Sequence, residues 1–229
     1  MESIHRGIDY PKISLLLEQK YSEFNHPKFI EPDPLMVVRE YKAVQEREFA
    51  AFIASQFALG RAVSIAATTS TILTNLCRAA AKKSERPFTL NPKEALLSMH
   101  ESELAPIFKN FVYRFFNSQD LIGLLLSLRA VYKTYGSLEK LLALSLKKTS
   151  RDLVPALSLF VSELELANPL QTKWKPNLVA SPAKGSACKR LMLFLRWMVR
   201  KDAVDPDGWS ILTPAELLAP LDTDRKSVV

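Results

Sequence analysis

Positively charged side chains recur along one segment near the end of the chain, residues 182–200. Gly185 lies in a turn that leads into a predicted helix. On that helix Lys189, Arg196 and Arg200 lie on one side, one or two turns apart. Cations spaced in this way on a helix can contact the phosphates of a nucleic acid. The apolar positions i, i+3, i+4 and i+7, which face the core, are Leu191, Phe194, Leu195 and Met198.

The sequence around this helix contains no acidic residue between Glu165 and Asp202. The stretch carries eight positive charges, which exceed the net charge of +7 of the whole chain, so the basicity is local. Local basicity is typical of a face that binds a polyanion. The alternative is a solvated basic surface that is offset by acids from elsewhere in the fold.

The residue types and their spacing give little support for a metal site, a nucleotide cofactor or a catalytic triad. The histidines, His5, His26 and His100, do not cluster with another potential ligand. Cys77 and Cys188 are far apart and lack metal-type spacing, which indicates free thiols in a reducing compartment. The chain has no phosphate-binding Gly-Lys-Ser/Thr loop, no dinucleotide fingerprint and no Ser-His-Asp pattern. We therefore expect neither a metal nor a cofactor.

Five motifs spread over nearly the whole chain point to a family. They are Phe29-Ile30 with Asp33-Pro34-Leu35, residues 111–116, residues 185–190, residues 194–200, and Pro220-Leu221-Asp222-Thr223. With these motifs the chain resembles an uncharacterised bacterial family allied to the helix-hairpin-helix DNA glycosylase superfamily. Its layout is similar to that of archaeal oxoguanine DNA glycosylases. The resemblance implies a helical glycosylase-like fold with a basic turn-helix element.

The resemblance also implies roles for the residues of this element. A turn at a helix N-terminus grips a DNA phosphate with backbone N–H groups, and Lys184, Gly185 and Ser186 match that turn. Lys189 matches a lysine whose amine attacks the sugar C1′ and leaves a Schiff base. Asp222 matches an aspartate that stabilises cationic character on the sugar. We expect further nucleic-acid contacts from Arg190, Arg196 and Arg200.

Three departures from the superfamily pattern accompany these matches. The lysine falls a few residues later in the helix, and Lys184 stands where the turn usually has a small residue. The gap between Lys189 and Asp222 is longer than in most members, although the archaeal group has a similar gap. Each role also has a structural alternative: Lys189 as a phosphate contact or solvated side chain, and Asp222 as a helix cap.

Several side chains are candidates for holding a base that has been flipped out of the duplex. Gln56 could wedge into the gap in the base stack, and aromatic rings could stack on the flipped base. The alternatives are that the aromatic residues belong to the core and that Asn117 caps a helix. The candidates are Gln56, Arg114, Phe115, Asn117 and Trp197.

Apolar residues at spacings of three and four, with only 6 glycines, predict an all-α fold. Shorter helical pieces are expected after Pro92, and a long loop from Asn168 to Ala183. One helix is expected to start at Asp33-Pro34, and three more to cover Glu48–Leu59, Arg61–Lys83 and Leu121–Tyr135, the last with Ser118 as its cap. A further helix is expected to begin at Gly136-Ser137. The last of this group is expected to run from a cap at Ser150 to Leu166.

The sequence also carries information on the domain organisation and on the two ends of the chain. Residues 1–223 read as one helical domain, with two lobes conceivable at about 1–110 and 111–223. Residues 224–229 read like translated sequencing adapter. We therefore expect the natural protein to continue beyond Thr223 with further helices, the alternative being a genuine polar tail. No signal peptide and no run of about 20 apolar residues is present, which predicts a cytoplasmic protein outside the membrane, and we expect it to be a monomer.

The sequence therefore predicts a DNA-repair glycosylase that acts on an oxidised purine in duplex DNA. It would flip the base and use Schiff-base chemistry at a lysine, with lyase activity as a further expectation. The alternative is a helical module that binds DNA or RNA without catalysis. A third hypothesis is an interaction protein whose basic face meets an acidic partner.

Overall fold

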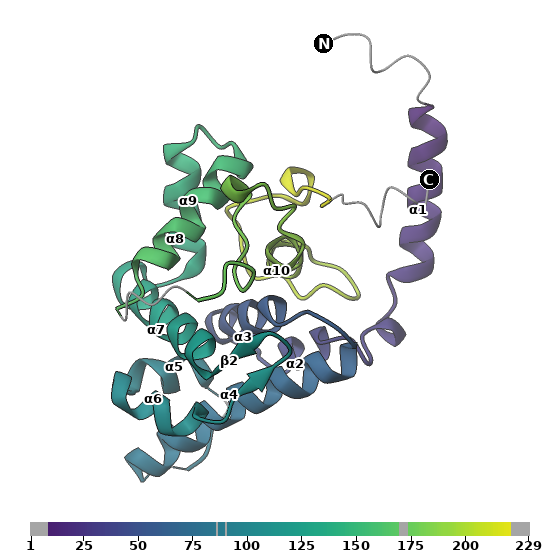
Figure 1. The fold of residues 1–229 in the computed structure, drawn as a ribbon. Coiled ribbons are helices and arrows are strands. Elements are labelled where there is room, and N and C mark those ends of the chain that lie inside the picture. The colour runs from purple at the N-terminus through teal and green to yellow at the C-terminus, as the bar shows by residue number, and fades with distance from the viewer. Residues whose placement is uncertain (1–8, 86, 90, 170–173, 221–229) are drawn as a thin grey trace.

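The computed structural model describes residues 9–85, 87–89, 91–169 and 174–220, which form an all-α fold with one small hairpin (Figure 1). The helices are α1 (Tyr10–Phe24), α2 (Leu35–Arg39), α3 (Val44–Gln56), α4 (Ala62–Ser84), α5 (Pro92–Ser98), α6 (Glu101–Phe108), α7 (Ser118–Tyr135), α8 (Leu138–Lys148), α9 (Leu153–Leu166) and α10 (Lys189–Val199). Three 3-10 turns and two antiparallel strands complete them: η1 (Pro27–Phe29), η2 (Pro182–Lys184), η3 (Pro214–Glu216), β1 (Val112–Tyr113) and β2 (Phe116–Asn117).

Helix α3 lies at the centre of the molecule, where α2, α4, α5 and α10 pack around it. Ten of its 13 residues are buried, so it is covered on every side. The ring of Phe52 meets those of Phe160 on α9 and Phe194 on α10, with centroids 6.3 and 5.1 Å apart. Buried residues from Leu35 to Leu212 form one continuous core.

Several predicted features are confirmed. The expected helix over Arg61–Lys83 is α4, shifted by one residue at each end. Gly136 ends α7 with a φ of +84°, and the Ser137 side chain accepts from the Lys140 N–H and caps α8. On α10 all four residues of the predicted apolar stripe are buried.

The predicted start of α7 is wrong, because Asn117 rather than Ser118 caps it. The Asn117 backbone is still extended at the end of β2, and its side chain accepts from the N–H groups of Gln119 and Asp120. Ser150 likewise does not cap α9. It and Arg151 adopt positive φ in the preceding turn, and the cap is Asp152, whose side chain accepts from Val154.

Two predicted helices have different limits. The helix expected over Glu48–Leu59 is α3, which begins at Val44 and ends at Gln56, before Gly60 with a φ of +108°. The helix expected from Asp33 and Pro34 is the short α2, which ends at Arg39. Its start agrees with the sequence, since the Asp33 side chain accepts from the Leu35 N–H at 2.8 Å.

Helix α1 was not predicted, and its apolar side chains do not face a core. None of its residues is buried, and Figure 1 shows it standing at the edge of the molecule. Its lower end is attached where the Tyr21 hydroxyl donates to Asp202 at 3.4 Å and the Arg200 guanidinium lies 5.5 Å from the Tyr21 ring. Within the described ranges, none of the helices has the length and apolar character to cross a membrane.

Candidate nucleic-acid interface

The turn before α10 places Lys189 at the first position of that helix. Gly185, with a φ of +73°, closes η2 by donating its N–H to the carbonyl of Pro182 at 2.9 Å. A Cβ at Gly185 would meet nothing within 4 Å, so the backbone angle rather than crowding favours glycine there. Cys188 is also left-handed, and its N–H donates to the Ser186 hydroxyl at 3.1 Å.

The start of this helix opens onto a pocket of about 280 Å³. Its walls come from the end of α3, the loops before and after η2, and the first turn of α10. Lys189 and Ser186 are exposed at this pocket, whereas Gln56 is buried with 1% exposure. The pocket therefore brings together four of the predicted site residues. Its lining is Gln56, Ala180, Ser186, Ala187, Cys188, Lys189, Arg190 and Leu191.

Arg190 connects three segments that lie far apart in the sequence. Its guanidinium donates to the carbonyl of Gln56 and to the carbonyl of Asn177. It also lies 5.8 Å from the centroid of the Phe116 ring. Burial lowers the pKa of this guanidinium from its ordinary value. In this arrangement Arg190 holds the pocket wall in place, with both of its terminal nitrogens bonded to carbonyls of the protein.

Acidic residues partner the two other arginines of α10. Arg196 Nε lies 2.9 Å from Asp205 Oδ2, and Arg200 lies 2.7 Å from Asp202 and 3.3 Å from Asp205. The side chain of Asp205 is 0% exposed. Burial raises the pKa of the Asp205 carboxyl, while the hydrogen bond and charge of Arg196 oppose that shift. Two members of the predicted cationic ridge, Arg196 on α10 and Arg200 just after it, are thus bonded to the following loop.

Lys184 is held far more loosely. Its Nζ lies 2.9 Å from Glu165, with side chains that are 52% and 40% exposed. An exposed pair of this kind contributes only about 0–1 kcal/mol, so a phosphate can compete for the lysine.

The β1–β2 hairpin lies next to this pocket. Phe57 at the end of α3 contacts Phe111, Tyr113 and Phe116, with ring centroids 5.6–6.1 Å apart. The Tyr113 hydroxyl donates to the Leu59 carbonyl at 2.8 Å. These contacts hold the hairpin against the end of α3.

Two predicted base-pocket residues form the tip of the hairpin. Arg114 is left-handed, with a φ of +53°, and its guanidinium lies 5.8 Å from the Phe115 ring. Phe115 is 58% exposed. Lys175 donates to the Phe115 carbonyl and lies 3.5 Å from Asp120. The tip therefore presents one aromatic ring among cations.

Two predicted base-pocket residues have structural roles instead. Trp197 lies on the buried face of α10 and belongs to the core, with 2% exposure. The Asn117 side chain is used to cap α7. Asp222 falls outside the described residues, so its position relative to Lys189 stays a prediction.

Three stretches of sequence without acidic residues meet at the hairpin: 49–84, 104–119 and 166–201. The polyanion-binding face predicted from the sequence included only the last of these stretches. The parts that come together, 53–61, 109–119 and 174–190, carry seven cations and no acid. The neighbouring acids are Asp120 and Glu165, which pair with Lys175 and Lys184. The cations are Arg61, Lys109, Arg114, Lys175, Lys184, Lys189 and Arg190.

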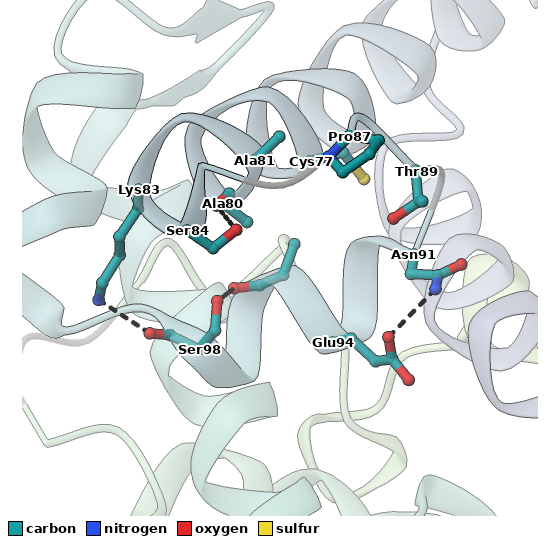
Figure 2. Close-up of a pocket in the computed structure, with 11 residues that line it drawn as sticks. Cys77, Ala80, Ala81, Lys83, Ser84, Pro87, Thr89, Asn91, Glu94 and Ser98 are labelled. Atoms are coloured by element: carbon teal, nitrogen blue, oxygen red, sulfur yellow. Dashed lines mark hydrogen bonds between the residues drawn. The ribbon is translucent and has the colours of Figure 1, made fainter.

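A second pocket, of about 500 Å³, lies between α4 and α5 (Figure 2). Its polar groups bond to one another: Lys83 donates to the Ser98 carbonyl at 3.0 Å, and Asn91 donates to Glu94 at 3.1 Å. Burial raises the pKa of the Cys77 thiol there to about 11, which keeps it protonated. Its one lysine, Lys83, is bonded to Ser98 and Glu103, and Glu94 lies on the same lining, so the pocket is a poorer candidate for an anionic ligand.

Metal binding finds no support in the part of the chain that the structure describes. No three His, Cys, Asp or Glu side chains in that part gather closely enough to hold an ion. Cys77 and Cys188 are both buried free thiols.

Fold and site together define an all-α protein with a basic pocket at the start of a helix. A protein family described as "Protein of unknown function (DUF2400)" matches residues 33–229, and the chain belongs to this family. Helix α1 lies before the matched region. No curated protein and no solved structure matches the chain.

Proposed function

We propose that this protein is a DNA-repair glycosylase with lyase activity that acts on an oxidised purine. The observation that carries the proposal is the pocket of about 280 Å³ that has Lys189 on its wall, at the N-terminus of α10. It lies within a surface to which three acid-free stretches contribute. A flipped base or its sugar could enter from that surface.

The proposed reaction uses the amine of Lys189 in its neutral form. Its lone pair forms a bond to the sugar C1′ while the bond from C1′ to the base breaks and its electron pair leaves with the base. The base gains a proton and the amine loses one. Opening of the sugar ring then gives a Schiff base between Nζ and C1′. Asp222 would stabilise cationic character on the sugar in this step.

Backbone N–H groups support the same site in a second way. The first turn of α10 has N–H groups without acceptors in the helix, and the helix dipole favours an anion there. The left-handed Gly185 and Cys188 shape the backbone that leads into this turn. A phosphate next to the flipped nucleotide would accept from these groups, with Lys184 as an exposed cation nearby.

Borohydride trapping tests the chemistry. The protein is incubated with duplexes that carry one 8-oxoguanine, and borohydride reduces any Schiff base to a stable adduct. We expect an adduct with the protein and none with Lys189→Gln. Lys148→Gln, an exposed lysine on α8, is the matched control and should trap normally.

A second candidate function is a DNA-binding module without catalysis. The meeting of three acid-free stretches favours it independently of the lysine chemistry. Binding that is steeply salt-dependent, equal for intact and damaged duplexes, and without an adduct would support this alternative and overturn the glycosylase.

A further inference from the structure

Another pocket opens between α4 and α6, next to the start of the hairpin at Val112. It has a volume of about 430 Å³. Thr68 and Asn75 of α4 lie on one wall, and Lys109 and Asn110, just after α6, lie on the other. In Figure 1 α6 lies beside α4, with the hairpin near both. We call this hollow the α4–α6 groove.

The α4–α6 groove offers cationic and neutral donors to an anion. Its lining comes entirely from the acid-free stretches 49–84 and 104–119. The acids of α6, Glu101 and Glu103, lie in its first turn, at the end away from Lys109. Glu103 is already paired with Lys83 at 2.8 Å. The Thr71 hydroxyl donates to the Ala67 carbonyl, which leaves Thr68, Asn75, Lys109 and Asn110 as the polar groups that face a ligand.

The hairpin connects this groove with the Lys189 pocket. Val112, at its start, lines the groove and is 74% exposed. Phe116, at its end, contacts the Arg190 guanidinium that lines the pocket. Between them stand Arg114 and the exposed ring of Phe115. A chain of alternating phosphates and bases can follow such a path, since cations contact its phosphates and an aromatic ring stacks on a base.

We infer that the α4–α6 groove is a second DNA subsite, which holds the strand that continues from the nucleotide bound at Lys189, with Phe115 stacking on a base between the two. This rests on the DNA-binding part of the proposed function and not on its chemistry. An acidic peptide would also be attracted by the charge. An exposed aromatic ring between two basic hollows fits a nucleic-acid strand better, because each base offers it a stacking face.

Affinity for DNA extended on one side only tests the inference. Duplexes carry a tetrahydrofuran abasic site, which fixes the register, and a long arm on either the 5′ or the 3′ side. We expect one arm to raise the affinity more than the other, because the groove lies on one side of the pocket. In Lys109→Glu this asymmetry should disappear, and the salt slope of log K should fall by about one phosphate contact.

Matched variants separate the possible causes. Lys148→Glu, the same charge reversal on α8, should retain the asymmetry, and Lys109→Gln should lose part of it. Phe115→Ala should weaken binding about fivefold or more without changing the salt slope, since stacking contributes about 1–3 kcal/mol per base. Far-ultraviolet circular dichroism and melting confirm that each variant is folded.

The outcomes distinguish this inference from the proposed function. Equal loss of affinity in Lys109→Glu and Lys148→Glu, or an asymmetry that survives Lys109→Glu, overturns the groove while leaving the trapping result untouched. Loss of the asymmetry without any trapped adduct supports the groove and rejects the chemistry. If the protein binds none of these duplexes, both are rejected.

Discussion

The indole N–H of Trp209 donates to Glu48 at 2.9 Å, joining the central helix α3 to the loop that follows α10. The same carboxylate accepts from the N–H groups of Leu138 and Glu139 at the start of α8, at 2.9 and 3.2 Å. Glu48 is 2% exposed, and burial raises the pKa of its carboxyl. One buried side chain therefore holds three segments together.

Replacing Glu48 by leucine should destabilise the fold strongly. The change removes the acceptor for two helix N–H groups and the Trp209 indole, and each buried donor left unsatisfied costs about 1–3 kcal/mol. We expect a loss of roughly 3 kcal/mol or more in urea unfolding. Glu18→Leu, at an exposed position on α1, is the control. Wild-type stability in Glu48→Leu would show that these bonds contribute little.

Two glycines near α10 should respond differently to alanine. Gly185→Ala should lower the free energy of unfolding by only about 1–2 kcal/mol, the cost of a left-handed backbone at alanine, because the space around the new Cβ is open. Gly208 has a φ of +146°, and a Cβ there would lie 2.8 Å from Met198 Cε and 3.0 Å from Val44 Cγ1. Gly208→Ala should therefore cost roughly 3 kcal/mol or more. Denaturant midpoints measured in parallel would check the order, and the reverse order would contradict it.

Local features of α10 could be predicted from the sequence because helical spacing alone determines them. The buried stripe and the position of Lys189 at the start of the helix are of this kind. The partners of Arg190 are not, since they are carbonyls at Gln56 and Asn177, 134 and 13 residues away. A carbonyl is present at every residue, so sequence carries no sign of which one an arginine will meet.

The β1–β2 hairpin, and the pairing of Asp202 and Asp205 with arginines, also could not be predicted from the sequence. Strands of two residues are too short to show an alternating pattern, so β1 and β2 left no signal. Asp202 and Asp205 come just after the acid-free stretch, and only the fold returns them to α10. The lack of acidic residues in 104–119 is visible in the sequence and indicates a basic surface. That this stretch lies near Lys189 could not be predicted, because it depends on the packing around Phe57.

Acidification should release the loop that Glu216 holds. Its carboxylate accepts from Arg151 at 2.5 Å and from the Thr213 N–H at 2.8 Å, and these bonds lower its pKa from 4.5 to about 2. Because the folded pKa is lowered, the contribution is present above about pH 4.5 and is lost as the pH falls towards 2. Glu216→Gln should therefore melt below the wild type at pH 7 and together with it near pH 2. A difference that persists at pH 2 would exclude this carboxylate as the cause.

Lys184 and Arg196 should contribute unequally to DNA affinity. Glu165 is 40% exposed, so water can solvate its carboxylate when Lys184 turns to a phosphate. The side chain of Asp205 is fully buried, so its carboxylate would be left unpaired and unsolvated if Arg196 turned to DNA. We expect Lys184→Gln to weaken duplex binding several-fold and to reduce the salt slope by about one contact, with unchanged melting. Arg196→Gln should instead lower the melting temperature and leave the salt slope nearly unchanged. Fluorescence anisotropy over a salt series measures both. A slope reduced by Arg196→Gln in a fully folded variant would show that the arginine leaves Asp205 to bind DNA.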